Sequence, residues 1–200
     1  MRNRRAARRT LGTMAESAGA PRRLAAVVIP IFANAPHDVV FVERARHLRR
    51  HAGQMAFPGG AVDDEDDGDL AHAALRELFE EIGIPAASVA IVDRLGLIRQ
   101  TNNVFNVTPF VAVVAPDAQL VVDLNEASAA HRVPLAAILA PGAVHPGVEV
   151  TAEQRRETPV FDYGALHVWG LTGFILDMFV SRYNTAGSAL RVALDERLLG

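Results

Sequence analysis

The clearest regular pattern of apolar and polar positions in the chain lies between Leu70 and Ile82. Apolar residues recur there at every fourth position, with further apolar residues beside them, and this spacing lines one face of a helix. Asp67 or Asp69 can cap the first turn, and Gly83 predicts the end of the helix. The pattern therefore predicts an amphipathic helix that buries one face against a core.

Shorter apolar runs rich in β-branched residues predict strands on both sides of this helix. The expected strands cover 24–32, 38–43, 89–92, 94–99, 104–114, 148–151 and 160–168. Successive strand residues point to opposite sides, so Val39 and Val40 should belong to different layers. Pro30 is expected to interrupt the first strand or to place it at an edge, because proline donates no ladder hydrogen bond.

Two further helices are expected in the last part of the chain. One begins at Trp169 and continues to about residue 183, and a short one covers 190–199. Four apolar residues of the longer helix are expected in the core, namely Phe174, Leu176, Met178 and Phe179. The short helix packs either on the same domain or on a second subunit, and the second arrangement would make the protein a homodimer.

The order of these elements suits an α/β sandwich, since a strand–turn–strand pair is followed by a Gly-Gly loop and a helix. A chain of 200 residues with 50% hydrophobic content can bury one good core. We therefore expect a single domain over residues 23–200. Residues 1–22 contain many Arg and small residues and are expected to form a disordered basic tail.

Composition narrows the classes of function. The net charge of −3 offers no positive field that would hold nucleic acid. No apolar run reaches the roughly 20 residues of a membrane-spanning helix. The absence of cysteine excludes disulfides, thiol catalysis and cysteine-bound zinc. We expect a cytoplasmic protein with neither nucleic-acid nor membrane partners; the alternative, import into mitochondria, rests on the Arg-rich start.

Three carboxylates on the predicted helix are the first candidates for chemistry. Glu77, Glu80 and Glu81 stand at positions i, i+3 and i+4, so they share one face and repel one another. The helix has no Lys to offset them, and Arg76 is expected to point elsewhere. A hard divalent cation would relieve the repulsion, and oxygen ligands favour Mg²⁺ or Mn²⁺ over zinc. The alternative is a solvated acidic face.

The segment Arg76–Ile84 resembles the second half of the Nudix box, R-E-U-x-E-E-x-G-U, in which U is a bulky aliphatic residue. The first half fits less well, because the sixth residue after Gly60 is Asp66 instead of Glu and two extra residues precede Arg76. The resemblance implies a Nudix-type α/β/α sandwich with a mixed β-sheet. It also implies that the box glutamates and a main-chain oxygen of Gly60 bind the metal, and that Arg76 orients a carboxylate of the box.

A second segment narrows the resemblance to one branch of the family. Residues 40–60 resemble the signature L-L-T-x-R-[SA]-x3-R-x3-G-x3-F-P-G-G of the coenzyme A pyrophosphatases, although residues 40–42 depart from L-L-T. Arg offers forked donors to phosphate oxygens, and coenzyme A carries a 3′-phosphate beyond its diphosphate. By resemblance, the substrate-binding residues are Arg44, Arg49, Gly59 and Gly60.

Glu126 is a further candidate, because residues 125–135 resemble a family segment in which a glutamate precedes an aliphatic residue, Pro and Leu. The resemblance implies a metal ligand or a general base at this position. The alternative is an ordinary carboxylate in a loop or at a helix start. For the general base, Glu77 is the first choice and Glu126 the second.

Together these features predict a metal-dependent hydrolase that cleaves the diphosphate of coenzyme A or its acyl derivatives, giving 3′,5′-ADP and 4′-phosphopantetheine. Two alternatives stay open. Another substrate, such as ADP-ribose, a dinucleotide polyphosphate or a nucleoside triphosphate, needs only a different specificity pocket. A non-catalytic nucleotide-binding domain would keep the fold, and the longer loop before Arg76 leaves this alternative open.

Overall fold

The structure, a computed structural model, describes residues 23–48, 51–99, 105–150 and 155–199. The expected basic tail at residues 1–22 and the predicted substrate ligand Arg49 lie outside these ranges. Within the described residues, no helix has both the length and the apolar character that a bilayer crossing requires.

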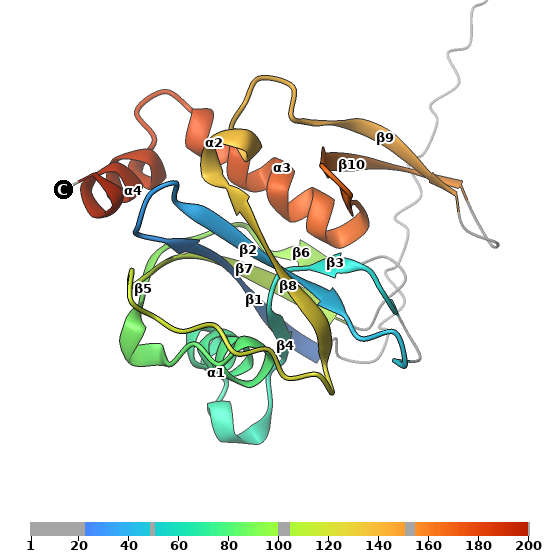
Figure 1. The fold of residues 1–200 in the computed structure, drawn as a ribbon, viewed down its shortest axis with the longest axis vertical. Helices are drawn as coiled ribbons and strands as arrows, with labels where there is room; N and C mark the ends of the chain where they lie inside the picture. The colour runs from blue at the N-terminus through green and yellow to red at the C-terminus, as the bar shows by residue number, and fades with distance from the viewer. Residues whose placement is uncertain (1–22, 49–50, 100–104, 151–154, 200) are drawn as a thin grey trace, which may run out of the picture.

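A mixed eight-stranded sheet forms the centre of the fold (Figure 1). Its strands are β1 (Arg23–Phe32), β2 (Asp38–Arg44), β3 (Met55–Ala56), β4 (Gly59–Ala61), β5 (Val89–Arg94), β6 (Ile98–Arg99), β7 (Phe105–Val114) and β8 (Ala127–Pro134). The order is β3-β2-β1-β7-β5, with β4 beside β1, β6 beside β7 and β8 beside β2. β1 and β7 run parallel over their whole lengths, and the other pairs are antiparallel.

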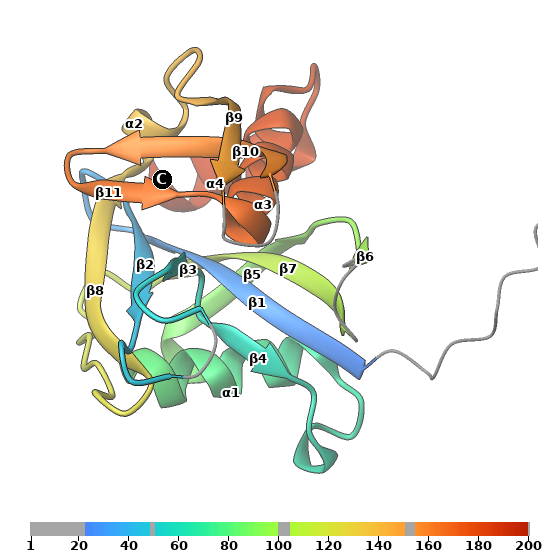
Figure 2. The ribbon, with the colours of Figure 1, turned by 90° about the vertical axis from the view of Figure 1, so that its right-hand side faces the viewer.

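Helices and a smaller sheet cover the two faces of the main sheet. They are η1 (Asp64–Asp66), α1 (Leu70–Ile82), η2 (Ala86–Ser88), α2 (Leu135–Ile138), β9 (Val144–Val150), β10 (Arg155–Tyr163), β11 (Leu166–Val168), α3 (Gly170–Asn184) and α4 (Ala189–Leu198). α1 lies on one face, whereas α2, α3, α4 and the sheet β11-β10-β9 lie on the other (Figures 1 and 2). This arrangement confirms the expected α/β/α sandwich with a mixed sheet.

Alternate residues of the strands supply a separate core on each face of the main sheet. In β2, Val39 and Phe41 pack in the layer that contains α3 and α4, whereas Val40 and Val42 pack in the layer that contains α1. This is the alternation that the strand pattern predicts. On α1 the buried apolar side chains are Ala73, Ala74, Leu78 and Ile82, and Leu70 is partly buried.

The expectation that Pro30 would interrupt β1 or move it to an edge is wrong, because β1 is central and contains Pro30. On the side away from β7, β1 pairs with β4 at residues 25–27 and with β2 at Ile31. Val28 donates to Pro58 O on that side (2.9 Å), and the nitrogen of Pro30 points the same way two residues later. The missing N–H therefore falls in the gap between two partner strands, where no ladder bond is lost.

α3 buries a slightly different set of side chains from the expected one. Leu176 and Phe179 are buried and Met178 is partly buried, but Phe174 is 42% exposed. Ile175 is buried in its place. Ile175 precedes Phe179 by one helical turn and therefore shares its face, while Phe174 is rotated towards solvent.

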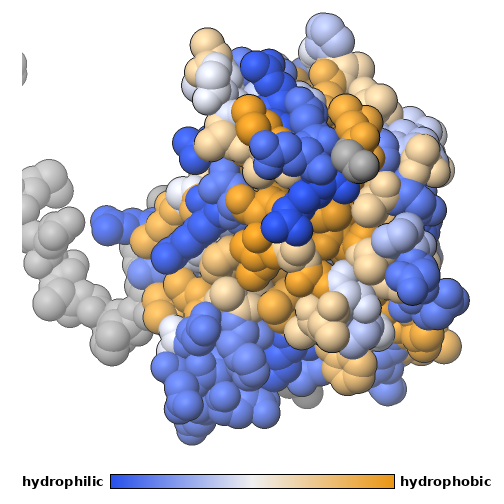
Figure 3. Space-filling view, turned by 90° about the vertical axis from the view of Figure 1, so that its left-hand side faces the viewer, coloured by the Kyte–Doolittle hydropathy of each residue, from blue (hydrophilic) through white to orange (hydrophobic). Residues whose placement is uncertain are grey.

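The surface of the described residues carries hollows whose lining does not include the box glutamates. The face that carries the β5 edge and α4 shows an apolar area between more hydrophilic regions (Figure 3). A hollow of about 300 Å³ lies there between Val89 and Arg197. A larger one of about 600 Å³ lies beside η1 and is lined by Arg23, Val62, Asp63, Asp64 and Glu65.

Candidate active site

α1 holds its glutamates in place because both of its ends are fixed. The Asp69 carboxylate caps the start and accepts hydrogen bonds from the N–H groups of Ala71 (2.8 Å) and His72 (3.2 Å). Gly83 ends the helix in the left-handed conformation, with φ 71°, as its position predicts. The helix packs through its apolar stripe, so Glu77 on its flank is turned towards β4.

Gly59 and Gly60 allow β4 to pass close to both β1 and α1. A Cβ atom at Gly60 would overlap the Glu77 carboxylate, and a Cβ atom at Gly59, where φ is 154°, would overlap the carbonyl oxygen of Ala26. Only glycine has room at these two positions. The Gly-Gly pair therefore brings the main chain of β4 against a carboxylate of α1.

Three carboxylates from two distant parts of the chain converge beside this contact. Glu77, Glu81 and Glu126 each offer an oxygen, and these oxygens all lie within 4.8 Å of one another. Glu126 precedes β8, and its carbonyl oxygen accepts a hydrogen bond from Ala45 N (2.9 Å), just after β2. The pairing of β8 with β2 thus brings Glu126 to the glutamates of α1.

Burial and mutual repulsion make this cluster unfavourable when it is charged. Burial, with the nearby Glu77 as a second cause, raises the pKa of Glu81 from 4.5 to about 8. Burial likewise raises the pKa of Glu77, against the opposing charge of Arg76. Glu81 is 4% exposed, and its Oε2 has no hydrogen-bond partner among the described residues. An unpartnered buried carboxylate oxygen is costly unless a cation or donor meets it.

The donor set of the cluster fits a hard divalent cation. Three carboxylates supply only oxygen ligands, which suit Mg²⁺ or Mn²⁺ and carry no nitrogen or sulfur that would favour zinc. The free Oε2 of Glu81 points to a missing partner of this kind. The residues present therefore fit the metal that the Nudix resemblance implies.

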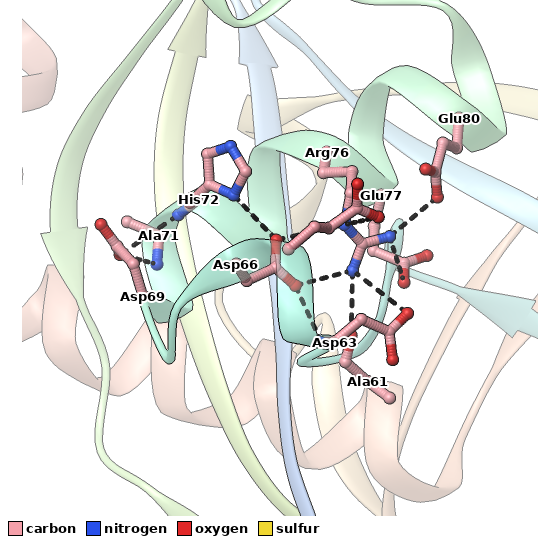
Figure 4. Close-up of polar contacts among 10 residues, drawn as sticks. Ala61, Asp63, Asp66, Asp69, Ala71, His72, Arg76, Glu77 and Glu80 are labelled. Atoms are coloured by element: carbon pink, nitrogen blue, oxygen red, sulfur yellow. Dashed lines mark hydrogen bonds and ion pairs between the residues drawn. The ribbon is translucent and has the colours of Figure 1, made fainter.

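Arg76 lies at the centre of a second group of carboxylates (Figure 4). Its Nη1 donates to Glu77 Oε1 (3.1 Å) and to Glu80 Oε2 (2.9 Å), and its Nη2 donates to Ala61 O (3.1 Å) in β4. The expectation that Arg76 points away from the glutamates is therefore wrong. Its long side chain lies along the helix surface and reaches a carboxylate one turn further on. Glu80 is bonded to Arg76 and is not among the three carboxylates that converge.

Asp66 anchors the other side of the Arg76 guanidinium. Arg76 Nε and Nη2 donate as a fork to Asp66 Oδ1 (3.1 Å) and Oδ2 (2.9 Å). Asp63 N donates to the same carboxylate (2.9 Å), and His72 Nδ1 lies 2.8 Å from Oδ1. The side chain is 2% exposed, and the hydrogen bonds from Arg76, as the largest cause, hold the pKa of Asp66 well below its usual range.

The sequence pattern alone did not predict that Asp66 anchors Arg76. The longer loop folds into η1, which turns Asp66 inward beneath Arg76. The signal in the sequence was the spacing, because Asp66 is the sixth residue after Gly60. The contact of His72 with Asp66 had no signal in the box pattern, since the two residues are brought together only by the fold of η1 against α1.

Arg44 ends β2 beside the glutamate cluster. Its main chain is fixed by Gln54 O (3.0 Å) and by the N–H of Gly53 (2.9 Å). Burial is the main influence on the pKa of Glu81, and the charge of Arg44 opposes it by lowering that pKa. Arg44 Nε is buried and has no hydrogen-bond partner among the described residues. A guanidinium thus stands next to the carboxylates with a donor available to a ligand.

Comparison with known proteins agrees with this geometry. The NUDIX domain family matches residues 21–154. A protein of Escherichia fergusonii named uncharacterized Nudix hydrolase NudL is 39% identical over 154 residues, which cover 77% of this chain and 79% of that protein. NudL of Escherichia coli K12 is 38% identical over the same shares of the two chains. A MutT/nudix family protein from Enterococcus faecalis has a similar fold, with a TM-score of 0.51 and 15% identity over 91% of this chain and 75% of that one.

The matched residues contain all the parts of the site described above, from Arg44 through the glutamates of α1 to Glu126. The match covers more than half of the chain, and the two relatives are 38–39% identical to it over 154 residues. The chain therefore belongs to the Nudix family of hydrolases, which act on phosphorus-containing anhydrides of nucleoside diphosphate derivatives.

Proposed function

We propose that this protein hydrolyses the diphosphate of coenzyme A or its acyl derivatives and releases 3′,5′-ADP and 4′-phosphopantetheine. The observation that carries the proposal is the position of the segment that resembles the coenzyme A signature. Arg44 and Gly60, two of its signature positions, both lie against the glutamate cluster. The segment that would decide the substrate is therefore in contact with the groups that would carry out the chemistry.

Glu77, Glu81 and Glu126 are the residues that would hold Mg²⁺ or Mn²⁺. Such an ion neutralises charge on a diphosphate and makes water more acidic. The main chain at Gly60 lies against Glu77 and is a further proposed ligand. Glu80 would become a further ligand of the ion only if its carboxylate gave up the 2.9 Å hydrogen bond that it accepts from Arg76.

The general base needs a carboxylate that is free to accept a proton. Glu126 is exposed, and its carboxylate takes no hydrogen bond from the described residues, so one of its oxygens would be free to accept a proton while the other held the ion. One oxygen of Glu77 already accepts from Arg76 at 3.1 Å. We therefore place Glu126 first and Glu77 second, which reverses the order expected from the sequence. The proton leaves the attacking water, the water oxygen bonds to one phosphorus, and the bond from that phosphorus to the bridging oxygen breaks.

Phosphate binding is assigned to Arg44, whose buried Nε has no partner among the described residues. A phosphate oxygen that accepts a hydrogen bond from this Nε–H would satisfy it. Arg49 is proposed for the same function on the strength of its place in the signature. The exposed Arg46 contacts Glu43 at 3.4 Å and is not assigned a function.

The test is a product assay in Mg²⁺ or Mn²⁺ with coenzyme A, ADP-ribose and a diadenosine polyphosphate offered in parallel. Turnover of coenzyme A to 3′,5′-ADP well above the other two supports the proposal. An Arg44→Gln variant should raise KM for coenzyme A, while Arg46→Gln serves as the matched control. Turnover of another substrate alone would keep the hydrolase and reject coenzyme A. Tight binding without turnover of any of the three would favour a binding domain.

A further inference from the structure

The segment that leads to Glu126 is hydrogen-bonded to the end of α1 through its main chain. The chain between β7 and β8 passes along this helix (Figures 1 and 2). Val121 N donates to Ile82 O (2.9 Å), and Asp123 N donates to Glu81 O (2.9 Å). The carbonyl groups of a last helical turn have no partner within the helix, so this segment supplies two of the donors that they need.

Asp123 is the residue through which the main chains of Glu81 and Glu126 are connected. Its N–H is bonded to Glu81 O, and its own carbonyl oxygen accepts from the N–H groups of Glu126 (3.1 Å) and Ala127 (2.9 Å). Glu81 and Glu126 are two of the three residues whose carboxylates converge. A displacement of Asp123 would therefore move one of these carboxylates relative to the other.

The Asp123 carboxylate closes the turn that precedes Glu126. Its Oδ1 accepts from the main-chain N–H of Asn125 (2.9 Å) and from the side-chain amide of the same residue (2.9 Å). A carboxylate that accepts from the N–H two residues later forms an Asx turn, which restricts the main chain of the residues between them. A side chain therefore helps to fix the main chain immediately before Glu126.

Glu126 depends on this turn more than the other two glutamates depend on their surroundings. Glu77 is hydrogen-bonded to Arg76 (3.1 Å) and Glu81 is buried. Glu126 and the two residues before it are exposed, and its carboxylate accepts no hydrogen bond from the described residues. The bond from Ala45 N to Glu126 O (2.9 Å) holds only the carbonyl group. The direction of the Glu126 side chain is therefore set mainly by the turn.

We propose that Asp123 is a positioning residue of the metal site, and that its carboxylate keeps Glu126 close enough to Glu81 for both to bind one cation. This assignment rests on the proposed function, in which Glu126 is a ligand of Mg²⁺ or Mn²⁺. Asp123 is not itself a ligand, since its carboxylate is not among the three that converge and its Oδ1 is engaged by Asn125. Loss of such a supporting group lowers metal affinity by about ten- to a hundredfold.

The alternative interpretation is that Asp123 only stabilises an exposed turn. Its replacement would then lower the stability of the protein and leave the Mn²⁺ affinity of the folded state unchanged. Metal affinity measured well below the unfolding temperature of each variant therefore separates the two interpretations, because only folded protein is then compared.

Calorimetry of Mn²⁺ binding to the full chain tests the proposal. Asp123→Ala should weaken binding by at least about tenfold, whereas Asp123→Asn should recover most of the loss, because its side-chain oxygen can still accept from Asn125. Asp123→Ala should add little to the loss in Glu126→Gln, since both changes act through one ligand. Asp93→Ala is the matched control, because Asp93 also accepts from a main-chain N–H (Arg94, 2.8 Å) but lies on β5.

Amide hydrogen exchange of the metal-free protein gives a reading that does not depend on metal binding. The N–H of Asn125 should exchange at least about tenfold faster in Asp123→Ala than in the wild type, and its protection should return in Asp123→Asn. Unchanged exchange in Asp123→Ala would overturn the proposal.

Two results of the calorimetry would also overturn it, and they have different meanings. If Glu126→Gln weakens Mn²⁺ binding but Asp123→Ala does not, Glu126 is a ligand that needs no support from Asp123, and the proposed function stands. If Glu126→Gln binds Mn²⁺ as the wild type does, Glu126 is rejected as a ligand and the positioning assignment falls with it.

Discussion

Two groups of carboxylates share Glu77 of α1, and they differ in whether one guanidinium is hydrogen-bonded to all of their members. Around Arg76, the carboxylates of Asp66, Glu77 and Glu80 all accept hydrogen bonds from one guanidinium. In the other group, Glu81 and Glu126 join Glu77, and Arg44 lies beside them and lowers the pKa of Glu81 by its charge. Among the described residues, however, Glu81 Oε2 has no hydrogen-bond partner. The pKa of Asp66 is accordingly lowered, and that of Glu81 is raised to about 8.

Glu77 belongs to both groups and shows how they depend on each other. Its Oε1 is held by Arg76, and its carboxylate is pressed against Gly60. The first group is complete in the protein alone and fixes the position of a side chain. The second lacks such a donor, and we propose that it uses that position to bind a cation. The comparison teaches that acidic residues of one helix can have pKa values shifted in opposite directions from their neighbours' by the charge and burial around them.

The largest effect on stability is expected from replacing Arg76, the cation to which Asp66, Glu77 and Glu80 are hydrogen-bonded. Arg76→Gln leaves the buried Asp66 without its main partner, so we expect the free energy of unfolding to fall by about 3–5 kcal/mol. Urea unfolding near neutral pH measures this loss. Arg182→Gln is the control, because Arg182 forms a 3.1 Å pair with Asp93 but is 52% exposed, and about 0–1 kcal/mol is expected there. Equal losses in the two variants would contradict the structural importance of Arg76.

In the second group, Glu81→Gln should lower metal-dependent turnover by more than about a hundredfold, because a proposed ligand is lost. Mn²⁺ should raise the unfolding temperature of the wild type but not of this variant. Glu80→Gln is the matched control, since Glu80 is bonded to Arg76, and a smaller loss is expected. A loss equal to that of Glu81→Gln would make Glu80 a metal ligand.

The same variant tests the raised pKa of Glu81 without metal. A carboxyl whose pKa rises from 4.5 to about 8 on folding binds its proton more tightly in the folded state. Its contribution to stability is therefore full below pH 4.5 and is lost as the pH rises towards 8. Unfolding in the presence of a chelator, at several pH values across this range, should show a decline in the wild type that Glu81→Gln lacks. Parallel curves would show that Glu81 ionises normally.

A smaller effect on stability is expected at Gly60 of β4, which lies against the Glu77 carboxylate. Gly60→Ala would push the Glu77 carboxylate aside, at a cost of about 1–3 kcal/mol, and should weaken Mn²⁺ binding. Calorimetry of Mn²⁺ binding and urea unfolding measure the two effects. Gly96→Ala is the control, because its Cβ would meet only the mobile end of Met178, at 3.3 Å. Unchanged Mn²⁺ affinity in Gly60→Ala would separate Glu77 from the metal.

The smallest effect is expected at His72, which makes one of the contacts to Asp66. His72→Ala should cost about 0.5–1.5 kcal/mol, because Arg76 and Asp63 N continue to satisfy the carboxylate. His72→Asn should restore part of that loss, since its amide can donate from a similar place. Urea unfolding of the two variants makes the comparison. A loss as large as that of Arg76→Gln would mean that His72, and not Arg76, holds Asp66.

Much of the fold and of the α1 glutamate face followed from local pattern. The stripe ending at Ile82 and the Gly83 stop predicted α1, and the alternation at Val39 and Val40 predicted the two layers. These predictions are correct because hydrophobic periodicity and helix capping depend on residues that are close together in the sequence. The prediction for Pro30 was wrong for a different reason. Whether its missing N–H costs a hydrogen bond depends on which strand lies beside it, and this depends on β2 and β4, which come later in the sequence.

The candidate site was harder to predict because it depends on side-chain direction. Sequence spacing placed Glu77 and Glu81 on α1 but could not show that Arg76 lies along the helix or that Glu80 follows it. Bringing Glu126 to the cluster required the pairing of β8 with β2. Only the family resemblance, and no local pattern, had singled Glu126 out.

The parallel pairing of β1 with β7 also has a consequence for synthesis of the protein on the ribosome. β1 cannot acquire this neighbour, in register from Arg23 with Phe105 to Phe32 with Val114, until a long stretch of later chain has emerged. α1 is made in that interval, with an apolar face and no complete sheet to cover it. Glu126 emerges later still. The nascent chain therefore exposes the apolar face of this helix well before its three glutamates can converge, and this is the period in which a chaperone would be of most use.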